Sequence, residues 1–172
     1  MILSMPKFCF ILCAFVLIVS CSRPGTKVPA KFQRDLEQFI ADATRLNALT
    51  EQGVNYSDFG NQLATVSAAF TIADAEWPSK HKGPARLQFR TALDQWKLVY
   101  RIWHAQIDHD ARFVHSPDEL TDPQLISAAS AYLPDLAKKE PPVGYRSVTR
   151  ALMRTAARDF SSAVAEINST TK

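Results

Sequence analysis

Residues 89–107 read FRTALDQWKLVYRIWHAQI, and this stretch decides the fold class. Its large apolar side chains recur at alternating spacings of four and three residues, which gathers them on one face of an α-helix. The side chains of this seam are Phe89, Leu93, Trp96, Tyr100, Trp103 and Ile107. The stretch therefore predicts a long helix whose aromatic face is buried against other helices.

The same helical period continues on both sides of this stretch. A second uninterrupted seam consists of Phe59, Leu63, Val66, Phe70, Ala73 and Trp77. Start and stop signals are supplied by Gly53, Asn55, Pro78, Pro84, Ser116–Pro117, Asp122–Pro123 and Pro134. We expect long helices over 30–50, 56–77, 84–113 and 143–168, with a short helix over 123–133. No run of alternation is long enough to predict a sheet, so we predict an all-α fold, an antiparallel four-helix bundle with one additional short helix.

The composition limits the kind of protein this is. The chain has 172 residues, 47% of them hydrophobic and 22% charged, which is typical of a single globular domain. Five glycines make a glycine-rich phosphate loop or a dinucleotide-binding fold improbable. The net charge of +3 is too small to predict a nucleic-acid partner.

The first twenty residues have the pattern of an export signal. Phe8–Val19 is an unbroken apolar run of twelve residues that follows Lys7. This run makes about 18 Å of helix, whereas a membrane-spanning helix needs about 20 apolar residues. We therefore expect a signal peptide over 1–20 that is removed from the mature protein.

The apolar run ends in Ile18–Ser22, which reads IVSCS and resembles the lipobox of bacterial lipoproteins. The resemblance implies a diacylglyceryl group on the Cys21 thiol, cleavage before Cys21, and no cofactor other than this covalent lipid. Cys9 and Cys13 would leave with the signal, so the mature chain would contain no disulfide. An ordinary secretory signal cut at another position is the alternative.

The lipobox interpretation divides the chain into three parts. Residues 1–20 are the signal peptide, 21–30 the lipidated cysteine with its tether, and 31–172 the helical domain. The tether from Ser22 to Ala30 reaches at most about 30 Å. Ser22 differs from the aspartate that retains such lipoproteins in the inner membrane, so a Gram-negative source implies the outer membrane, facing the periplasm.

Four arginines recur every four residues in the last helix and form a basic ridge opposite its apolar face. They are Arg146, Arg150, Arg154 and Arg158. Guanidinium groups suit phosphate or carboxylate recognition, which predicts a surface for an acidic envelope partner or anionic lipid. The alternative is a solvated face partly neutralised by Asp35, Glu37 and Asp42.

Asp159 falls within the apolar stripe of the same helix, between Leu152 and Ala163. A carboxylate in such a place needs a partner, and we expect His104 or an arginine such as Arg101 to supply it. No nucleophile or second carboxylate accompanies Asp159 at a defined spacing, so a buried structural pair is favoured over a catalytic acid.

A group of acids and histidines lies near the end of the third expected helix: His104, Asp108, His109, Asp110 and His115. Only His104 and Asp108, at i and i+4, share a helix side, and the spacings typical of helical zinc or di-iron sites do not occur. They are weak metal candidates. The sequence thus predicts a non-enzymatic, lipid-anchored interaction module, with a small-ligand or metal carrier near His104 and Asp159 as the alternative.

Overall fold

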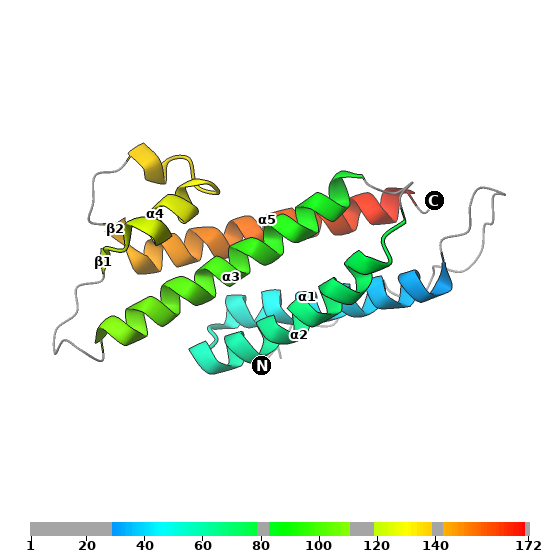
Figure 1. The fold of residues 1–172 in the computed structure, drawn as a ribbon, viewed down its shortest axis with the longest axis horizontal. Helices are drawn as coiled ribbons and strands as arrows, with labels where there is room; N and C mark the ends of the chain where they lie inside the picture. The colour runs from blue at the N-terminus through cyan, green and yellow to red at the C-terminus, as the bar shows by residue number, and fades with distance from the viewer. Residues whose placement is uncertain (1–28, 79–82, 111–118, 139–142, 171–172) are drawn as a thin grey trace, which may run out of the picture.

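The computed structural model describes residues 29–78, 83–110, 119–138 and 143–170, and these are mostly helical, which confirms the all-α prediction (Figure 1). The helices are α1 (Ala30–Gln52), α2 (Tyr56–Ala75), α3 (Pro84–Asp110), α4 (Pro123–Ser130), the short 3-10 turn η2 (Leu136–Lys138) and α5 (Tyr145–Thr170). The expected boundaries within the described ranges lie within about three residues of these, as is usual for helix ends.

The long helices pack in neighbouring pairs. The most extensive contacts join α3 to α5 and α1 to α2, and smaller ones join α2 to α3 and α1 to α5. Helix α2 is therefore separated from α5 by α1 on one side and by α3 on the other. Helix α4 packs against α3 and lies at the end of the molecule where α5 begins (Figure 1).

The helix ends follow from the residues predicted to mark them. Asn55 accepts a hydrogen bond from the backbone N–H of Asp58 at 2.8 Å, which satisfies a free donor of the first turn of α2. Asp122 caps α4 in the same way, with Pro123 at its first position. Gly53 ends α1 with φ of 84°, a conformation that side chains disfavour. The Ser116–Pro117 signal lies outside the described residues.

Two short strands depart from the prediction that the chain forms no sheet. β1 (Glu119–Leu120) pairs antiparallel with β2 (Val143–Gly144), so that the chain on either side of α4 is brought together. Strands of two residues are too short to display alternation, which is why the sequence pattern does not reveal them. The pairing also moves the start of α5 from Val143 to Tyr145.

The core contains most side chains of the two predicted seams together with apolar residues of the other helices. Phe39, Phe59, Phe89 and Trp96 are completely buried. Phe39 lies at the centre, with its ring 5.1 Å from that of Phe89 in an edge-to-face arrangement. Such aromatic contacts add to the stabilisation that burial supplies.

Ile107, the last member of the seam that begins at Phe89, is not in the core. Ile107 is 46% exposed, although it continues the four–three spacing of Phe89 and Trp96. Figure 1 shows that the end of α3 extends past the start of α2, so α2 does not cover the last turns of α3. Helical spacing identifies the face of a helix but does not identify how far its neighbour reaches.

Candidate functional site

The arginine ridge lies on the solvent side of α5. Arg146, Arg150, Arg154 and Arg158 are all exposed. The opposite side of the helix buries Val148, Leu152, Ala156, Phe160 and Ala163. The ridge extends about 18 Å from its first arginine to its last, at 1.5 Å per residue. The structure therefore places the four predicted side chains together on one accessible surface.

The three acids of α1 that the sequence places near the ridge have partners on their own helix. Asp35 faces Lys31 of its own helix at 3.8 Å. Glu37 accepts a hydrogen bond from Gln33 at 3.0 Å, and Asp42 accepts one from Gln38 at 2.8 Å. Acids of α1 are thus engaged within α1, because i,i+4 neighbours on one helix are closer than side chains across a helix pair.

The arginines at the two ends of the ridge have local contacts on α5. The guanidinium of Arg146 lies 5.7 Å from the ring centre of Tyr145, and Arg158 Nε lies 3.8 Å from Asp159 Oδ1. Arg150 and Arg154, in the middle, form no ion pair with a residue that the structure describes. The centre of the ridge therefore presents two unneutralised guanidinium groups to solvent.

Asp159 turns inward, as its place in the apolar stripe predicts, and its side chain is 24% exposed. Its partner is Gln95 of α3, whose Nε2 donates to Asp159 Oδ2 at 2.8 Å, rather than His104 or Arg101. Gln95 is buried, and its Oε1 has no hydrogen-bond partner among the described residues. Sequence reasoning missed Gln95 because a neutral amide in a helical pattern gives no charge signal.

His104 and Asp108 do meet, with His104 Nδ1 3.0 Å from Asp108 Oδ2. Both side chains are more than half exposed, and the described residues contain no group of three metal-ligating side chains. The side chains of His109 and Asp110 lie outside the described set, as does His115. The pair is a solvated i,i+4 contact at the end of α3.

A ring cluster adjoins this pair. Tyr56 of α2 stacks on Tyr100 of α3 with ring centres 4.6 Å apart and planes 9° apart, and His104 meets Tyr56 edge-on. Burial and the neighbouring Tyr100 phenol raise the pKa of Tyr56 to about 12, so its phenol stays neutral at physiological pH. His104 therefore faces α2, whereas Asp159 approaches α3 from α5, and the structure does not bring these two residues together.

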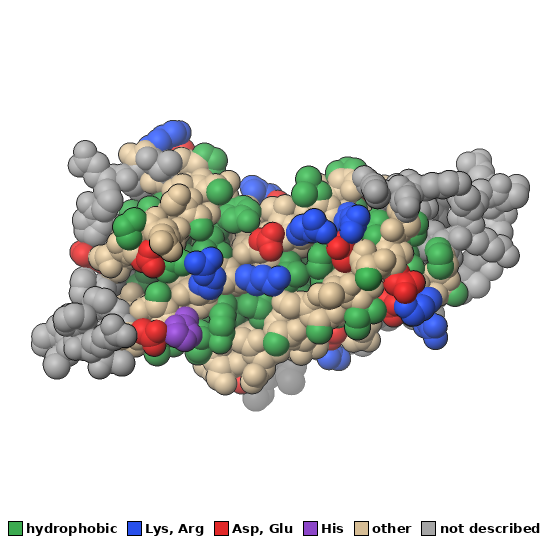
Figure 2. All heavy atoms as spheres, viewed as in Figure 1, with side chains coloured by type: hydrophobic (Ala, Val, Ile, Leu, Met, Phe, Trp, Pro, Cys, Tyr) green, Lys and Arg blue, Asp and Glu red, His purple; other side chains and the backbone are tan. Residues whose placement is uncertain are grey.

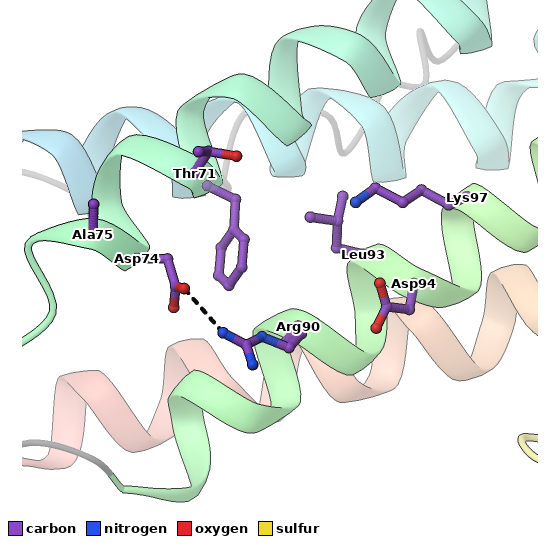
Figure 3. Close-up of a pocket in the computed structure, with 8 residues that line it drawn as sticks. Thr71, Asp74, Ala75, Arg90, Leu93, Asp94 and Lys97 are labelled. Atoms are coloured by element: carbon purple, nitrogen blue, oxygen red, sulfur yellow. Dashed lines mark hydrogen bonds and ion pairs between the residues drawn. The ribbon is translucent and has the colours of Figure 1, made fainter.

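A groove of about 410 Å³ between α2 and α3 is a feature that the sequence did not predict. Its residues are Phe70, Thr71, Asp74, Ala75, Arg90, Leu93, Asp94 and Lys97. Figure 3 shows Asp74 of α2 facing Arg90 of α3, with Asp94 and Lys97 farther along α3. The groove carries both signs of charge over an apolar floor.

At one end of the groove, the carboxylate of Asp74 on α2 binds two arginines of α3. Asp74 Oδ1 lies 2.6 Å from Arg86 Nε and its Oδ2 lies 2.9 Å from Arg90 Nη2. The hydrogen bond from Arg86 holds the pKa of Asp74 below its ordinary value. The groove charges are thus partly neutralised by each other, which distinguishes them from the ridge on α5.

Two further findings bear on what this chain is. No helix in the described part of the chain is long and apolar enough to cross a membrane. Comparisons with protein-family models, with curated proteins and with solved structures found no match.

Proposed function

We propose that this chain is a lipid-anchored lipoprotein of the bacterial cell envelope whose helical domain is a non-enzymatic interaction module. The anchor would be a diacylglyceryl group on Cys21, which lies outside the described residues, and a Gram-negative source would place the protein on the outer membrane facing the periplasm. The apolar run Phe8–Val19 and the lipobox-like segment Ile18–Ser22 at its end support this proposal.

We infer that the domain is an antiparallel four-helix bundle of α1, α2, α3 and α5, with α4 as the additional short helix. The closed sequence of contacts, from α1 to α2, α3, α5 and back to α1, supports this architecture. The aromatic rings of the seams fill its centre, so the bundle interior serves stability and the binding function belongs to the surface.

The observation that carries the proposal is the arginine ridge of α5. Arg150 and Arg154 are exposed and meet no described carboxylate, whereas Asp74 in the α2–α3 groove binds two arginines. Exposed guanidinium groups such as those of Arg150 and Arg154 are suited to phosphate or carboxylate groups of another molecule. An anionic lipid or an acidic envelope protein is therefore the class of partner, and nucleic acid is not part of the proposal.

A small-ligand or metal carrier remains the second candidate, and one observation favours it. Gln95 Oε1 and Trp96 Nε1 are buried without a hydrogen-bond partner among the described residues. Unsatisfied interior polar groups of this kind can hold water or a small polar ligand. Metal analysis of the gently isolated protein tests the metal form of this candidate, since about one metal ion per chain would support it.

The lipid anchor is tested by replacing Cys21. The Cys21→Ser variant should accumulate as unprocessed precursor, because the thiol that accepts the lipid is gone. Ser20→Ala is the matched control: it keeps a small residue before Cys21 and should be processed like the unsubstituted chain. Normal processing of Cys21→Ser, read by mass spectrometry of the mature N-terminus, would refute the lipobox interpretation.

The partner is tested by crosslinking the anchored protein in cells and identifying what is captured. An abundant envelope component that is recovered with the unsubstituted chain and lost with an Arg150→Glu/Arg154→Glu variant would support the interaction module. Equal recovery from both chains would exclude the ridge as the binding surface.

A further inference from the structure

We propose that the arginine ridge of α5 faces the bilayer and binds anionic phospholipid head groups, so that the domain lies along the membrane that holds it. This inference rests on the proposed lipid anchor at Cys21. It narrows the proposed partner from any acidic envelope component to the phosphate groups at the surface of a lipid bilayer.

The first argument is the distribution of charge between opposite helices. The exposed charged side chains of α5 are the four ridge arginines, while Asp159 and Glu166 are half-buried. Helix α2 contains no lysine or arginine and carries Asp58 and Asp74, with Glu76 at its C-terminal cap. Asp74 is paired with Arg86 and Arg90, and Glu76 with Lys31, so the α2 side has little net charge, whereas the α5 side is basic. Because α1 and α3 separate α2 from α5, an anionic surface would attract the α5 side more strongly than the α2 side.

The helices between these two sides carry both signs of charge. Figure 2 shows basic and acidic side chains interspersed over a face that includes α3. On α3, the exposed basic residues Arg90, Lys97 and Arg101 are accompanied by the exposed acids Asp94 and Asp108. Mixed charges cancel at the distances over which a membrane surface acts, since the screening length is about 8–10 Å. The α5 surface is therefore the one that an anionic bilayer would select.

The second argument is the absence of an apolar centre on this surface. The residues beside the arginines on this face are mostly small, namely Ser147, Ala151, Ala157 and Ser161, and the larger Met153 at its edge is half-buried against the core. The exposed large apolar side chains of the described residues are Ile72, Leu87 and Ile107, and none lies on α5. Stable protein–protein interfaces have an apolar, often aromatic centre, whereas contact at the level of lipid head groups requires charge alone. This composition favours a head-group surface over a protein partner.

The third argument is that the four arginines can reach one plane. At about 100° per residue, successive ridge positions turn by about 40°, so the four arginines fan over about 120°. The middle pair, Arg150 and Arg154, would face the bilayer, and long flexible side chains let Arg146 and Arg158 reach the same plane.

The anchor can lie beneath this surface. Helices α1 and α5 pack together, with the Phe39 and Phe160 rings 6.4 Å apart. Ala30 precedes Phe39 by about 14 Å of helix, and the tether before it reaches about 30 Å. Cys21 can therefore enter the bilayer next to α5 while the ridge rests on the head groups.

The test uses the full chain, isolated from membranes in detergent and reconstituted into vesicles. A lipidated Cys21 leaves no free thiol in the mature chain, so single cysteines can be labelled with a fluorescent donor, with an acceptor dye on the lipid. Ser161→Cys places the donor on the ridge, and Ala68→Cys places it on the exposed side of α2. Labelling of the unsubstituted chain serves as the control for the state of Cys21.

In vesicles that contain phosphatidylglycerol, we expect stronger energy transfer from Ser161→Cys than from Ala68→Cys. The difference should disappear in pure phosphatidylcholine vesicles, which lack the anionic lipid. It should also disappear at about 0.5 M NaCl, because salt screens the attraction. Equal transfer from both sites under all conditions would overturn the proposal.

Substitutions in the ridge test whether its positive charges bind the domain to the membrane surface. Each basic residue near an anionic surface contributes about fivefold to binding, so Arg150→Gln/Arg154→Gln should lower the ratio of docked to undocked domain about 25-fold. Arg150→Lys/Arg154→Lys should retain most of the docking. Arg34→Gln/Arg101→Gln removes the same charge from α1 and α3 and should have little effect. A loss as large in this control would show that net charge, rather than the ridge, matters.

The failure of this inference can be separated from failure of the proposed function. If the chain stays with the vesicles but the two donors report equal distances, the anchor stands and the docking is refuted. If Cys21 of the unsubstituted chain reacts with the label, or the chain leaves the vesicles, the lipid anchor itself is refuted. If the ridge donor becomes shielded only when envelope proteins are added, the partner is a protein and the bilayer proposal is wrong.

Discussion

Replacing Gly60 by alanine tests a close contact between α2 and α3. A Cβ atom at this position would lie 2.7 Å from Cε2 and 3.3 Å from Cζ of Tyr100. The ring cannot move away freely, because it stacks on Tyr56 with ring centres 4.6 Å apart. The substitution must therefore displace the stacked ring or separate the two helices.

The expected magnitude follows from two opposing effects. Alanine in the interior of a helix is favoured over glycine by about 1 kcal/mol. Overpacking costs about 1–3 kcal/mol, and a disturbed aromatic pair loses about 0.5–1.5 kcal/mol more. We expect Gly60→Ala to lower the free energy of unfolding by about 1–2 kcal/mol, although the same change in an isolated helix would stabilise it.

A double-mutant cycle with Tyr100→Ala isolates the cause. Once the ring is removed, nothing opposes the better helix propensity, and Gly60→Ala should raise the free energy of unfolding by about 1 kcal/mol. Both backgrounds can be measured by urea unfolding followed by circular dichroism. If Gly60→Ala stabilises the chain that contains Tyr100, the close contact carries no energetic weight and the reasoning fails.

Further substitutions at Trp96, Ile107, Asp159 and Asp74 probe the core and two half-buried carboxylates. Trp96→Ala should cost about 3–5 kcal/mol because the side chain is fully buried, whereas Ile107→Ala in the same seam should cost well under half of that; equal losses would contradict the burial. Asp159→Ala should cost about 1–3 kcal/mol by leaving the amide of Gln95 without its acceptor, and Asp159→Asn, which keeps an acceptor oxygen, should cost less. Asp74→Asn should destabilise the protein by about 1 kcal/mol at neutral pH. The pKa of Asp74 in the folded state lies below its unfolded value of 3.8. The stabilisation by ionised Asp74 is therefore complete above the unfolded pKa and is lost as the pH falls through the folded pKa. If the stability difference between the unsubstituted chain and Asp74→Asn does not change with pH, ionised Asp74 does not contribute this stability.

The sequence predicts the helices and their buried faces because both depend on local spacing. Phe59 and Phe89 each belong to an unbroken four–three seam, and each is completely buried. The caps at Asn55 and Asp122 are equally local, since a side chain bonds to a backbone group two or three residues away. These features can be inferred from a single segment without knowledge of its neighbours.

Contacts between helices could not be predicted in the same way. The helical period shows that Asp159 turns inward, but its partner Gln95 depends on the rotation and register of α3 against α5. Asp42 is a second example: the sequence suggests it as an acid near the arginine ridge, yet it is 4% exposed and accepts a hydrogen bond from Gln38 of its own helix. Partner choice across a helix pair is a property of the assembled structure.

The α2–α3 groove arises from the same kind of long-range arrangement. At one end of this helix pair, Gly60 lets Tyr100 approach closely. At the other end, the charged side chains of Asp74 and Arg90 stand between the helices and a groove opens beside them. Nothing in either segment alone indicates where the two helices converge or separate.

The ridge makes a final prediction that separates stability from binding. Arginines four residues apart repel each other, and each such pair costs a helix a few tenths of a kcal/mol. Arg154→Glu would convert two repulsive pairs, with Arg150 and Arg158, into attractive ones. We expect the free energy of unfolding to rise by about 0.5–1 kcal/mol while docking on phosphatidylglycerol vesicles is lost. If stability alone determined this surface, we would not expect a row of like charges in which a single substitution raises the free energy of unfolding. If Arg154→Glu destabilises the protein, the arginine has a structural partner and the ridge is not free to bind a membrane.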